Sequence, residues 1–202
     1  MSVRLVLASQ SPARLATLRA AGVEPRVVVS GVDESVVTTP DPAALAAELA
    51  TLKADAVVTR LAGDGAEDDF VLGCDSVLGF DGDVLGKPDD ADDAVRRWRR
   101  MRGRSGVLHT GHCLVERATG RRLVRPAATT VHFADLTDAE IDAYVATAEP
   151  LAVAGAFTVD GLGGPFVRGI EGDYHNVVGL SLPVLREMLA ELGVPWHHLW
   201  TR

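Results

Sequence analysis

The chain is poor in cysteine, aromatic residues and lysine, and it has no long apolar run. Its two cysteines, Cys74 and Cys113, form neither a disulfide framework nor the paired CxxC pattern of a structural zinc site. No apolar stretch approaches the roughly 18 residues that a membrane span requires, and the N-terminus lacks the apolar core of a signal peptide. We therefore expect a reduced, cytoplasmic location and no membrane partner.

Positive charge is also scarce, because the formal net charge is −8 at pH 7. Duplex nucleic acid binds to a basic protein face, so we expect no nucleic-acid polymer as a partner. The arginine-rich segment 96–104 follows a run of aspartates, and pairing along one helix explains that order better than a nucleic-acid patch. A small anionic substrate is compatible with this composition, since it needs only a local cluster of positive groups.

Apolar strand patterns alternate with amphipathic helical patterns along the chain. Strands are predicted over Val3–Ala8, Arg26–Ser30, Phe70–Phe80, Val107–Glu116, Leu123–Phe133 and near Phe166–Ile170. Helices are predicted over Pro12–Ala21, Asp41 to about Leu61, Asp89–Arg102, a segment opened by the capping box Thr137-x-x-Glu140, and Pro183–Leu192. Asp81-Gly82 predicts a hairpin turn, and Ala62–Asp69 predicts a polar loop. This order predicts one α/β domain over residues 1–202, with a mixed β-sheet flanked by helices.

The first strand runs directly into the segment Ser9-Gln10-Ser11-Pro12-Ala13-Arg14. Ser11 is a favourable N-cap, and Pro12 suits the first turn of a helix. Free backbone N–H groups and the positive end of the helix dipole make such a helix start an anion site, above all for phosphate. Ser9 and Ser11 add donors, and Arg14 adds a forked cation. The alternative is a well-capped helix with a surface arginine.

One acidic residue stands inside an apolar stretch that we expect to be the central strand. Asp75 lies in the segment Gly73–Ser76, which we place at the end of this strand, with apolar residues on both sides. A buried carboxylate is costly unless it is paired, hydrated or bound to a metal, and such groups are often general bases or metal ligands. The alternative is a carboxylate that neighbouring backbone N–H groups satisfy.

Lysine occurs only at Lys53, in the long second helix, and at Lys87, between a glycine and a proline just after the hairpin. Taken singly, each reads as a solvated surface charge. Together with the segment Ser9–Arg14, called the Ser–Pro segment below, however, these cations can hold a polyphosphate. Asp75 and Glu34, which follows the second strand, can bind a divalent cation or position a water molecule for hydrolysis of a phosphoanhydride. The chain has no GxxxxGK[ST] motif, so a Walker-type ATPase is not expected.

Ordered sequence blocks over most of the chain form one recognisable pattern. They are Leu7–Arg14, Val32–Glu34, Lys53-Ala54, Gly73–Ser76, Leu85–Pro88, Thr110-Gly111, Leu136–Ile141, Ala154–Phe157, Gly161–Gly164 and Asn176–Pro183. This pattern resembles that of the Maf family, the septum-formation-type nucleotide pyrophosphatases. The resemblance implies an elongated mixed sheet like that of inosine triphosphatases, and hydrolysis of nucleoside triphosphates to the monophosphate and pyrophosphate.

The resemblance also implies roles for individual residues and partners. Asp75 would be the general base, and the residues that contact the substrate would be Ser9, Arg14, Glu34, Lys53 and Lys87. A divalent cation, Mg²⁺ or Mn²⁺, would be required, with Asp75 and Glu34 as its protein ligands. Homodimerisation is a further implication, and so is a part in clearing the nucleotide pool that is linked to arrest of cell division.

The chain departs from the usual family pattern at three positions. Ala13 replaces an arginine, Val153 replaces a lysine, and Asp160 stands where members that act on thymidine and uridine triphosphates carry glutamine. At Ala13 and Asp160 the chain resembles a branch that acts on methylated guanine nucleotides. Our hypothesis is that Asp160 accepts a hydrogen bond from an N–H group of the base, so a non-standard or methylated base is one expectation.

Two other functions are compatible with these residues. One is a non-catalytic regulator of septum formation that binds nucleotides or proteins, and the other is a phosphohydrolase that acts on sugar or inorganic phosphate esters. The presence of Asp75 together with Lys53 and Lys87 favours catalysis, because a carboxylate that faces a polyphosphate repels it unless a metal or water intervenes. We therefore expect a nucleoside triphosphate as the substrate.

Overall fold

The computed structural model describes residues 3–64 and 69–201, so residues 65–68 of the predicted polar loop lie outside the described residues. The strands are β1 (Leu5–Leu7), β2 (Arg26–Val27), β3 (Phe70–Phe80), β4 (Asp83–Leu85), β5 (Ser105–Glu116), β6 (Arg122–Phe133) and β7 (Val167–Glu171). The α-helices are α1 (Pro12–Ala20), α2 (Pro42–Arg60), α3 (Ala91–Met101), α4 (Asp138–Ala146), α5 (Tyr174–Val178) and α6 (Leu182–Glu191).

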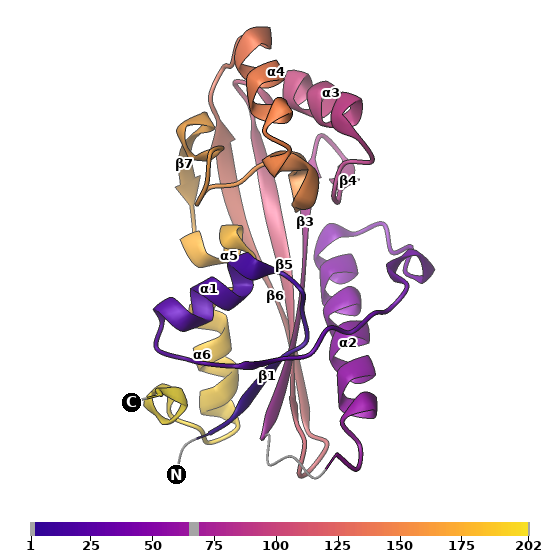
Figure 1. Cartoon of the computed structure of the whole chain (residues 1–202), viewed down its shortest axis with the longest axis vertical. Coiled ribbons are helices and arrows are strands. Elements are labelled where there is room, and N and C mark those ends of the chain that lie inside the picture. Colours follow the sequence, from indigo (N-terminus) through magenta and orange to yellow (C-terminus); the bar gives the residue numbers. More distant parts are fainter. Residues whose placement is uncertain (1–2, 65–68, 202) are drawn as a thin grey trace.

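The strands form one mixed sheet in the order β2-β1-β3-β5-β6-β7, and β4 pairs with β3 (Figure 1). β1 runs parallel to β2 and β3, whereas the other pairs are antiparallel. The predicted mixed α/β sheet is therefore confirmed. The predicted hairpin is also present: Asp81 and Gly82 have φ angles of 56° and 85°, the combination that a two-residue I′ turn requires.

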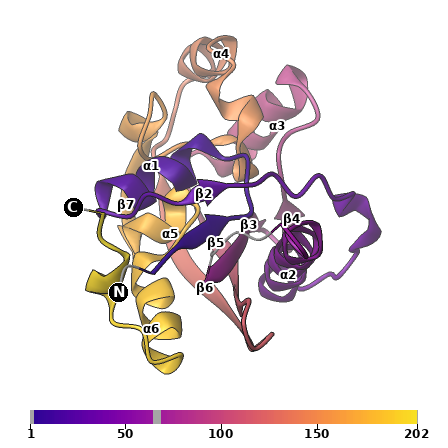
Figure 2. The ribbon, with the colours of Figure 1, turned by 60° about the horizontal axis from the view of Figure 1, so that its bottom comes forward.

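Three hydrophobic cores hold the helices on the two faces of the sheet. On one face, α2 packs through Ala50 and Val57 against β1, β3 and β5. On the other face, Trp98 of α3 lies in the core that α3 and α4 form at one end of the sheet (Figure 1). Leu18 of α1 and Leu185 of α6 lie in the core at the other end. Figure 2 shows α2 on one side of the strands and α5 and α6 on the opposite side.

A buried polar layer separates the two cores that share a face. Ser76 Oγ and Thr110 Oγ1 lie 2.9 Å apart across β3 and β5, and Thr110 Oγ1 donates to the Asn176 carbonyl at 3.1 Å. The Asn176 side-chain amide in turn donates to the Leu108 carbonyl at 3.2 Å and to Thr129 Oγ1 at 3.0 Å. Because hydrogen bonds replace apolar packing here, polar groups can reach the middle of β3 from this face.

Local signals placed most helix ends correctly. Ser11 caps α1, Asp41 caps α2, and the capping box of Thr137 and Glu140 opens α4. The predicted pairing along the arginine-rich helix is present, with Arg97 2.6 Å from Asp93 at i,i+4. No helix in the described part of the chain combines the length and apolarity that a bilayer crossing demands.

Two elements differ from the sequence expectation. The strand predicted over Arg26–Ser30 ends at Val27, because β1 ends at Leu7 and offers no partner beyond it. The short helix α5 was not expected, since only the Asp173 cap and the left-handed Gly179 (φ 117°) mark its two ends.

His112 gives the fold a predictable dependence on pH. Its ring is buried, Nε2 accepts from the Ser181 N–H at 2.8 Å, and burial lowers the pKa of His112 to about 4. A histidine that is harder to protonate when folded contributes stability that is fully present above its unfolded pKa of about 6.5 and is lost as the pH falls toward 4. We expect the preferential protonation of His112 in the unfolded state to lower the free energy of unfolding by about 2–3 kcal/mol as the pH falls between those values.

Urea denaturation at pH 7 and pH 4.5 measures this loss, with His112→Gln as the control. The variant keeps a hydrogen-bond acceptor for Ser181 but has no ionisable ring, while all carboxylates titrate as before. Equal losses in the wild type and the variant would contradict the assignment.

Candidate active site

The site forms where part of β3 has no strand partner along one of its two edges, while β5 pairs with it along the other. β1 pairs with β3 only as far as Leu72, and β4 begins to pair with it at Leu78. Neither strand pairs with the stretch from Gly73 to Val77, and a cleft of about 750 Å³ opens there. The predicted site residues all line this cleft: Ser9, Ser11, Arg14, Glu34, Lys53, Asp75, Lys87 and Asp160.

Asp75 is not at the tip of the third strand, as we expected, but in the middle of β3. The apolar stretch that predicted a buried strand continues to Phe80, and Asp75 reaches the cleft because its neighbour β1 ends early. Its side chain is 10% exposed and forms a short hydrogen bond with Lys53 Nζ. The ammonium group of Lys53 therefore pairs with this carboxylate. The alternative interpretation was that neighbouring backbone N–H groups satisfy Asp75.

Two glycines bring Lys53 to Asp75. A Cβ atom on Gly73 would lie 2.2 Å from the Ala50 carbonyl oxygen, and one on Gly111 would lie 2.1 Å from that of Ala46. Because neither strand carries a side chain at these points, α2 lies directly on the sheet and its lysine reaches the face that carries Asp75.

Lys53 is a buried bridge between two acids and not a surface charge. Its side chain is 11% exposed and contacts Asp75 on one side and Glu34 Oε1, at 2.8 Å, on the other. Glu34 begins the short 3₁₀-helix Glu34–Val36 and is half exposed. The two carboxylates thus converge on one cation at the wall of the cleft.

The Ser–Pro segment builds a second cationic group on the opposite face of β3. Arg14 is buried, and its guanidinium donates to Ser9 Oγ at 3.2 Å, Ser76 Oγ at 3.1 Å and the Gly179 carbonyl at 2.7 Å. Ser11 caps the helix, as predicted, and its N–H donates to Ser9 Oγ at 3.1 Å. Alternation along the strand places Ser76 and Asp75 on opposite faces, so the cleft is lined from both faces.

Among the described residues, only neutral oxygens fix the Arg14 guanidinium. Within residues 3–64 and 69–201, no acidic side chain forms an ion pair with its guanidinium. A buried cation without a counter-charge is costly, so this position favours an incoming anion.

Lys87 lies in an exposed turn that α3 holds in place. Arg97 Nη1 donates to the Gly86 carbonyl at 2.7 Å, and Asp93 fixes Arg97 in turn at 2.6 Å. The Lys87 side chain forms no ion pair with any described acid, so its ammonium is available in the cleft. The sequence predicts the arginine-rich helix only as internally paired, and the support that Arg97 gives this turn was not expected.

Ser76 is another residue that the sequence analysis left without a role. It belongs to the sequence block Gly73–Ser76, lines the cleft, and links Arg14 to the buried Thr110. The strand alternation pointed to its position opposite Asp75, but nothing in the sequence showed that Arg14 would meet it there.

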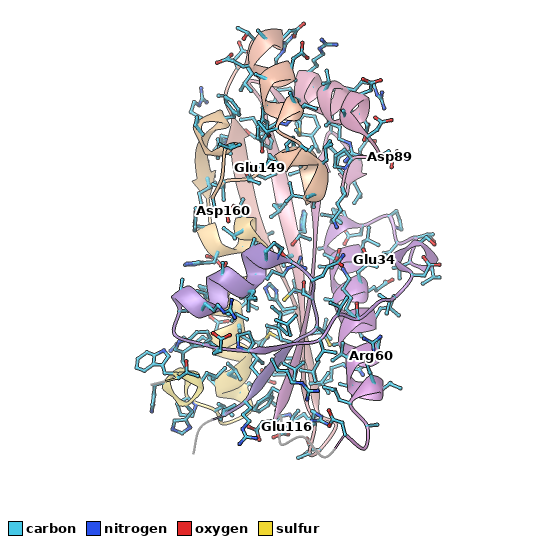
Figure 3. The ribbon with its side chains drawn as sticks, viewed as in Figure 1. Glu34, Arg60, Asp89, Glu116, Glu149 and Asp160 are labelled. Carbon is cyan, nitrogen blue, oxygen red and sulfur yellow. The ribbon has the colours of Figure 1, made fainter. Side chains whose placement is uncertain are left out.

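Asp160 lies at the cleft on an irregular loop, residues 158–163, between α4 and β7. In the view of Figure 3, Asp160 and Glu34 lie on opposite sides of the central strands. The site therefore has acidic side chains from three separate segments, Glu34, Asp75 and Asp160, with the cations Arg14, Lys53 and Lys87 along the same cleft.

Comparison with known proteins shows the family to which this chain belongs. The sequence profile described as "Maf-like protein" matches residues 4–192. A Salinispora tropica protein named nucleoside triphosphate pyrophosphatase is 62% identical over 202 residues, which cover 100% of this chain and 89% of that protein. A Streptomyces coelicolor protein of the same name is 57% identical, with 98% of this chain and 94% of that protein covered. The chain therefore belongs to the Maf family.

Proposed function

We propose that this protein is an enzyme that hydrolyses nucleoside triphosphates to the nucleoside monophosphate and pyrophosphate. The observation that carries the proposal is one cleft in which Arg14 and Lys87, cations without a described acidic partner, lie along the same walls as the Asp75–Lys53–Glu34 group. Such a cleft can hold a polyphosphate and present a carboxylate to it. The names of the related proteins support the same reaction.

The reaction needs positioning and charge stabilisation more than covalent chemistry by the protein. Arg14, Lys87 and the N–H groups at the start of α1 bind phosphate oxygens. Asp75 accepts a proton from a water molecule whose oxygen attacks the α-phosphorus, and the bond to the oxygen that bridges the α and β phosphates breaks. Pyrophosphate leaves with its new charge beside the cations.

A divalent cation, Mg²⁺ or Mn²⁺, fits the residues present. No described residues form a cluster of three or more potential metal ligands, so the protein offers no cage of its own. Mg²⁺ typically takes one or two protein carboxylates and completes its shell with substrate phosphates and water. Asp75 and Glu34, which converge on Lys53, would hold such an ion. When bound, the ion neutralises phosphate charge and lowers the pKa of bound water.

Asp160 is proposed to recognise the base. Its exposed carboxylate lines the cleft and can accept a hydrogen bond from a base N–H. If so, Asp160→Gln changes the relative activity toward different bases, including methylated ones. Unchanged ratios would remove Asp160 from this role.

A product assay tests the proposed reaction. The protein is incubated with standard and modified nucleoside triphosphates and with Mg²⁺ or Mn²⁺, and phosphorus NMR identifies the products. Release of pyrophosphate supports the proposal, whereas orthophosphate indicates another phosphohydrolase and binding without products indicates a regulator. Sedimentation of the same preparation tests the expected homodimer.

Loss of the buried guanidinium should weaken substrate binding strongly. A charge-assisted hydrogen bond contributes about 1.5–3 kcal/mol, so we expect Arg14→Met to raise KM by about 10–100-fold. Arg19→Met is the matched control, because Arg19 lies on the same helix but pairs with Glu24 at 2.6 Å on the surface. A KM for Arg14→Met within about twofold of the wild-type value would contradict the assignment, provided that circular dichroism shows a folded variant.

A further inference from the structure

The 158–163 loop is the part of the cleft wall that suits the uncharged end of a nucleotide. Its residues, Thr-Val-Asp-Gly-Leu-Gly, include no basic side chain, and Thr158 and Asp160 line the cleft. The Asp160 carboxylate repels phosphate but can accept hydrogen bonds from sugar or base. The loop contains neither a helix nor a strand. Contacts with side chains outside the loop must therefore fix its shape.

Glu149, which opens the 3₁₀-helix Glu149–Ala152 after α4, holds this loop from behind and does not itself line the cleft. Its Oε1 accepts from Thr158 Oγ1 at 2.5 Å and from the Gly163 N–H at 3.1 Å. Its Oε2 accepts from the Leu162 N–H at 3.1 Å. The Tyr144 hydroxyl, 3.3 Å from Oε1, adds a further donor.

The loop is wrapped closely around this carboxylate. A Cβ atom on Gly161 would lie 2.7 Å from Glu149 Oε2, and one on Gly163 would lie 2.4 Å from the Tyr144 hydroxyl oxygen. Burial alone would raise the pKa of Glu149, but hydrogen bonds from the loop outweigh burial and hold it below its usual range. At neutral pH the group is therefore an anion that accepts from donors at both ends of the loop.

We propose that Glu149 is a positioning residue for recognition of the base and sugar: it fixes the 158–163 loop so that Asp160 and Thr158 face the bound nucleotide. This inference rests on the proposed function, because it assigns the loop to the uncharged end of a nucleoside triphosphate. Glu149→Gln would turn an NH₂ group toward donors of the loop, which leaves at least one of them without an acceptor.

The test compares Glu149→Gln with Glu140→Gln. Glu140 is the matched control, because its carboxylate also accepts from a backbone N–H and a hydroxyl, both of Thr137, but it lies at the start of α4 and not at the cleft. Calorimetry measures the affinity of α,β-methylene nucleoside triphosphates, which resist cleavage, and of inorganic tripolyphosphate. Hydrogen exchange measures the protection of the Leu162 and Gly163 amides.

For Glu149→Gln we expect about tenfold weaker nucleotide binding, tripolyphosphate binding within about twofold of wild type, and loss of amide protection in the loop. Tyr144→Phe keeps the ring but removes a donor to Glu149 and the acceptor of the Thr158 N–H, so it should show the same pattern. Equal losses for nucleotide and tripolyphosphate, or equal effects of Glu140→Gln, would overturn the proposal. Failure of the wild type to cleave any triphosphate would instead count against the proposed reaction, since these binding and exchange measurements need no turnover.

Discussion

Asp75→Asn should lower kcat by about 10²–10⁴-fold while nucleotide binding is kept, because asparagine has the shape of aspartate but cannot take up a proton. The side-chain oxygen of asparagine can still accept the hydrogen bond from Lys53, so α2 and the cleft should stay in place. In the absence of a divalent cation, removing one negative charge from the cleft should leave the affinity for a triphosphate equal or higher. Single-turnover kinetics, with separate titration of a non-cleavable nucleotide, distinguishes the two effects.

Asp138→Asn is the control for this experiment. Asp138 pairs with Arg102 at 2.6 Å on the surface at the start of α4, outside the cleft. Its replacement should leave kcat unchanged. If Asp75→Asn turned over at a near-normal rate, Asp75 would have no part in proton transfer.

Gly111→Ala should destabilise the fold by about 3 kcal/mol or more, because the added Cβ would overlap the backbone of α2 and cannot be relieved by a side-chain rotation. The nearest atoms, at 2.1 to 2.5 Å, all belong to the backbone of Ala46 and Ala47. α2 would have to move away from β5, and Lys53 would move with it. Urea denaturation measures the loss of stability, and any folded fraction should also show reduced kcat/KM.

Gly79→Ala provides the comparison, since Gly79 lies on the same face of the sheet but a Cβ there meets its nearest atoms at an ordinary 3.5 Å. We expect its unfolding free energy to stay within about 1 kcal/mol of wild type. Similar losses for the two variants would mean that the close approach of α2 is not what makes Gly111 necessary.

The candidate site shows which parts of such a protein a sequence can predict. Ser11 as an N-cap, the Asp81-Gly82 hairpin and the long helix carrying Lys53 follow from preferences that act within a few residues. The set of cleft residues came largely from the resemblance to the Maf family. The structure brings all of them to one cleft, while their roles stay predictions until the variants are assayed.

What the sequence could not predict depends on contacts between distant segments. Asp75 was expected at a strand tip, whereas it reaches the cleft from the middle of β3 because β1 ends at Leu7. The short second strand ends where it does for the same reason. The support of the Lys87 turn by Arg97 and of the 158–163 loop by Glu149 likewise needs contacts that no local pattern encodes.

The sequence by itself determined the chemical groups, the family and most helix ends, since caps, periodicity and motif order are local properties of the chain. Only the tertiary structure decided which charges are paired: Lys53 joins two acids, while Arg14 is held by neutral oxygens. The physical reason is that charge pairing and strand exposure depend on where other segments end in space. That arrangement gives β3 an unpaired edge and places beside it a guanidinium that pairs with no described acid, and both make the cleft suited to a polyphosphate.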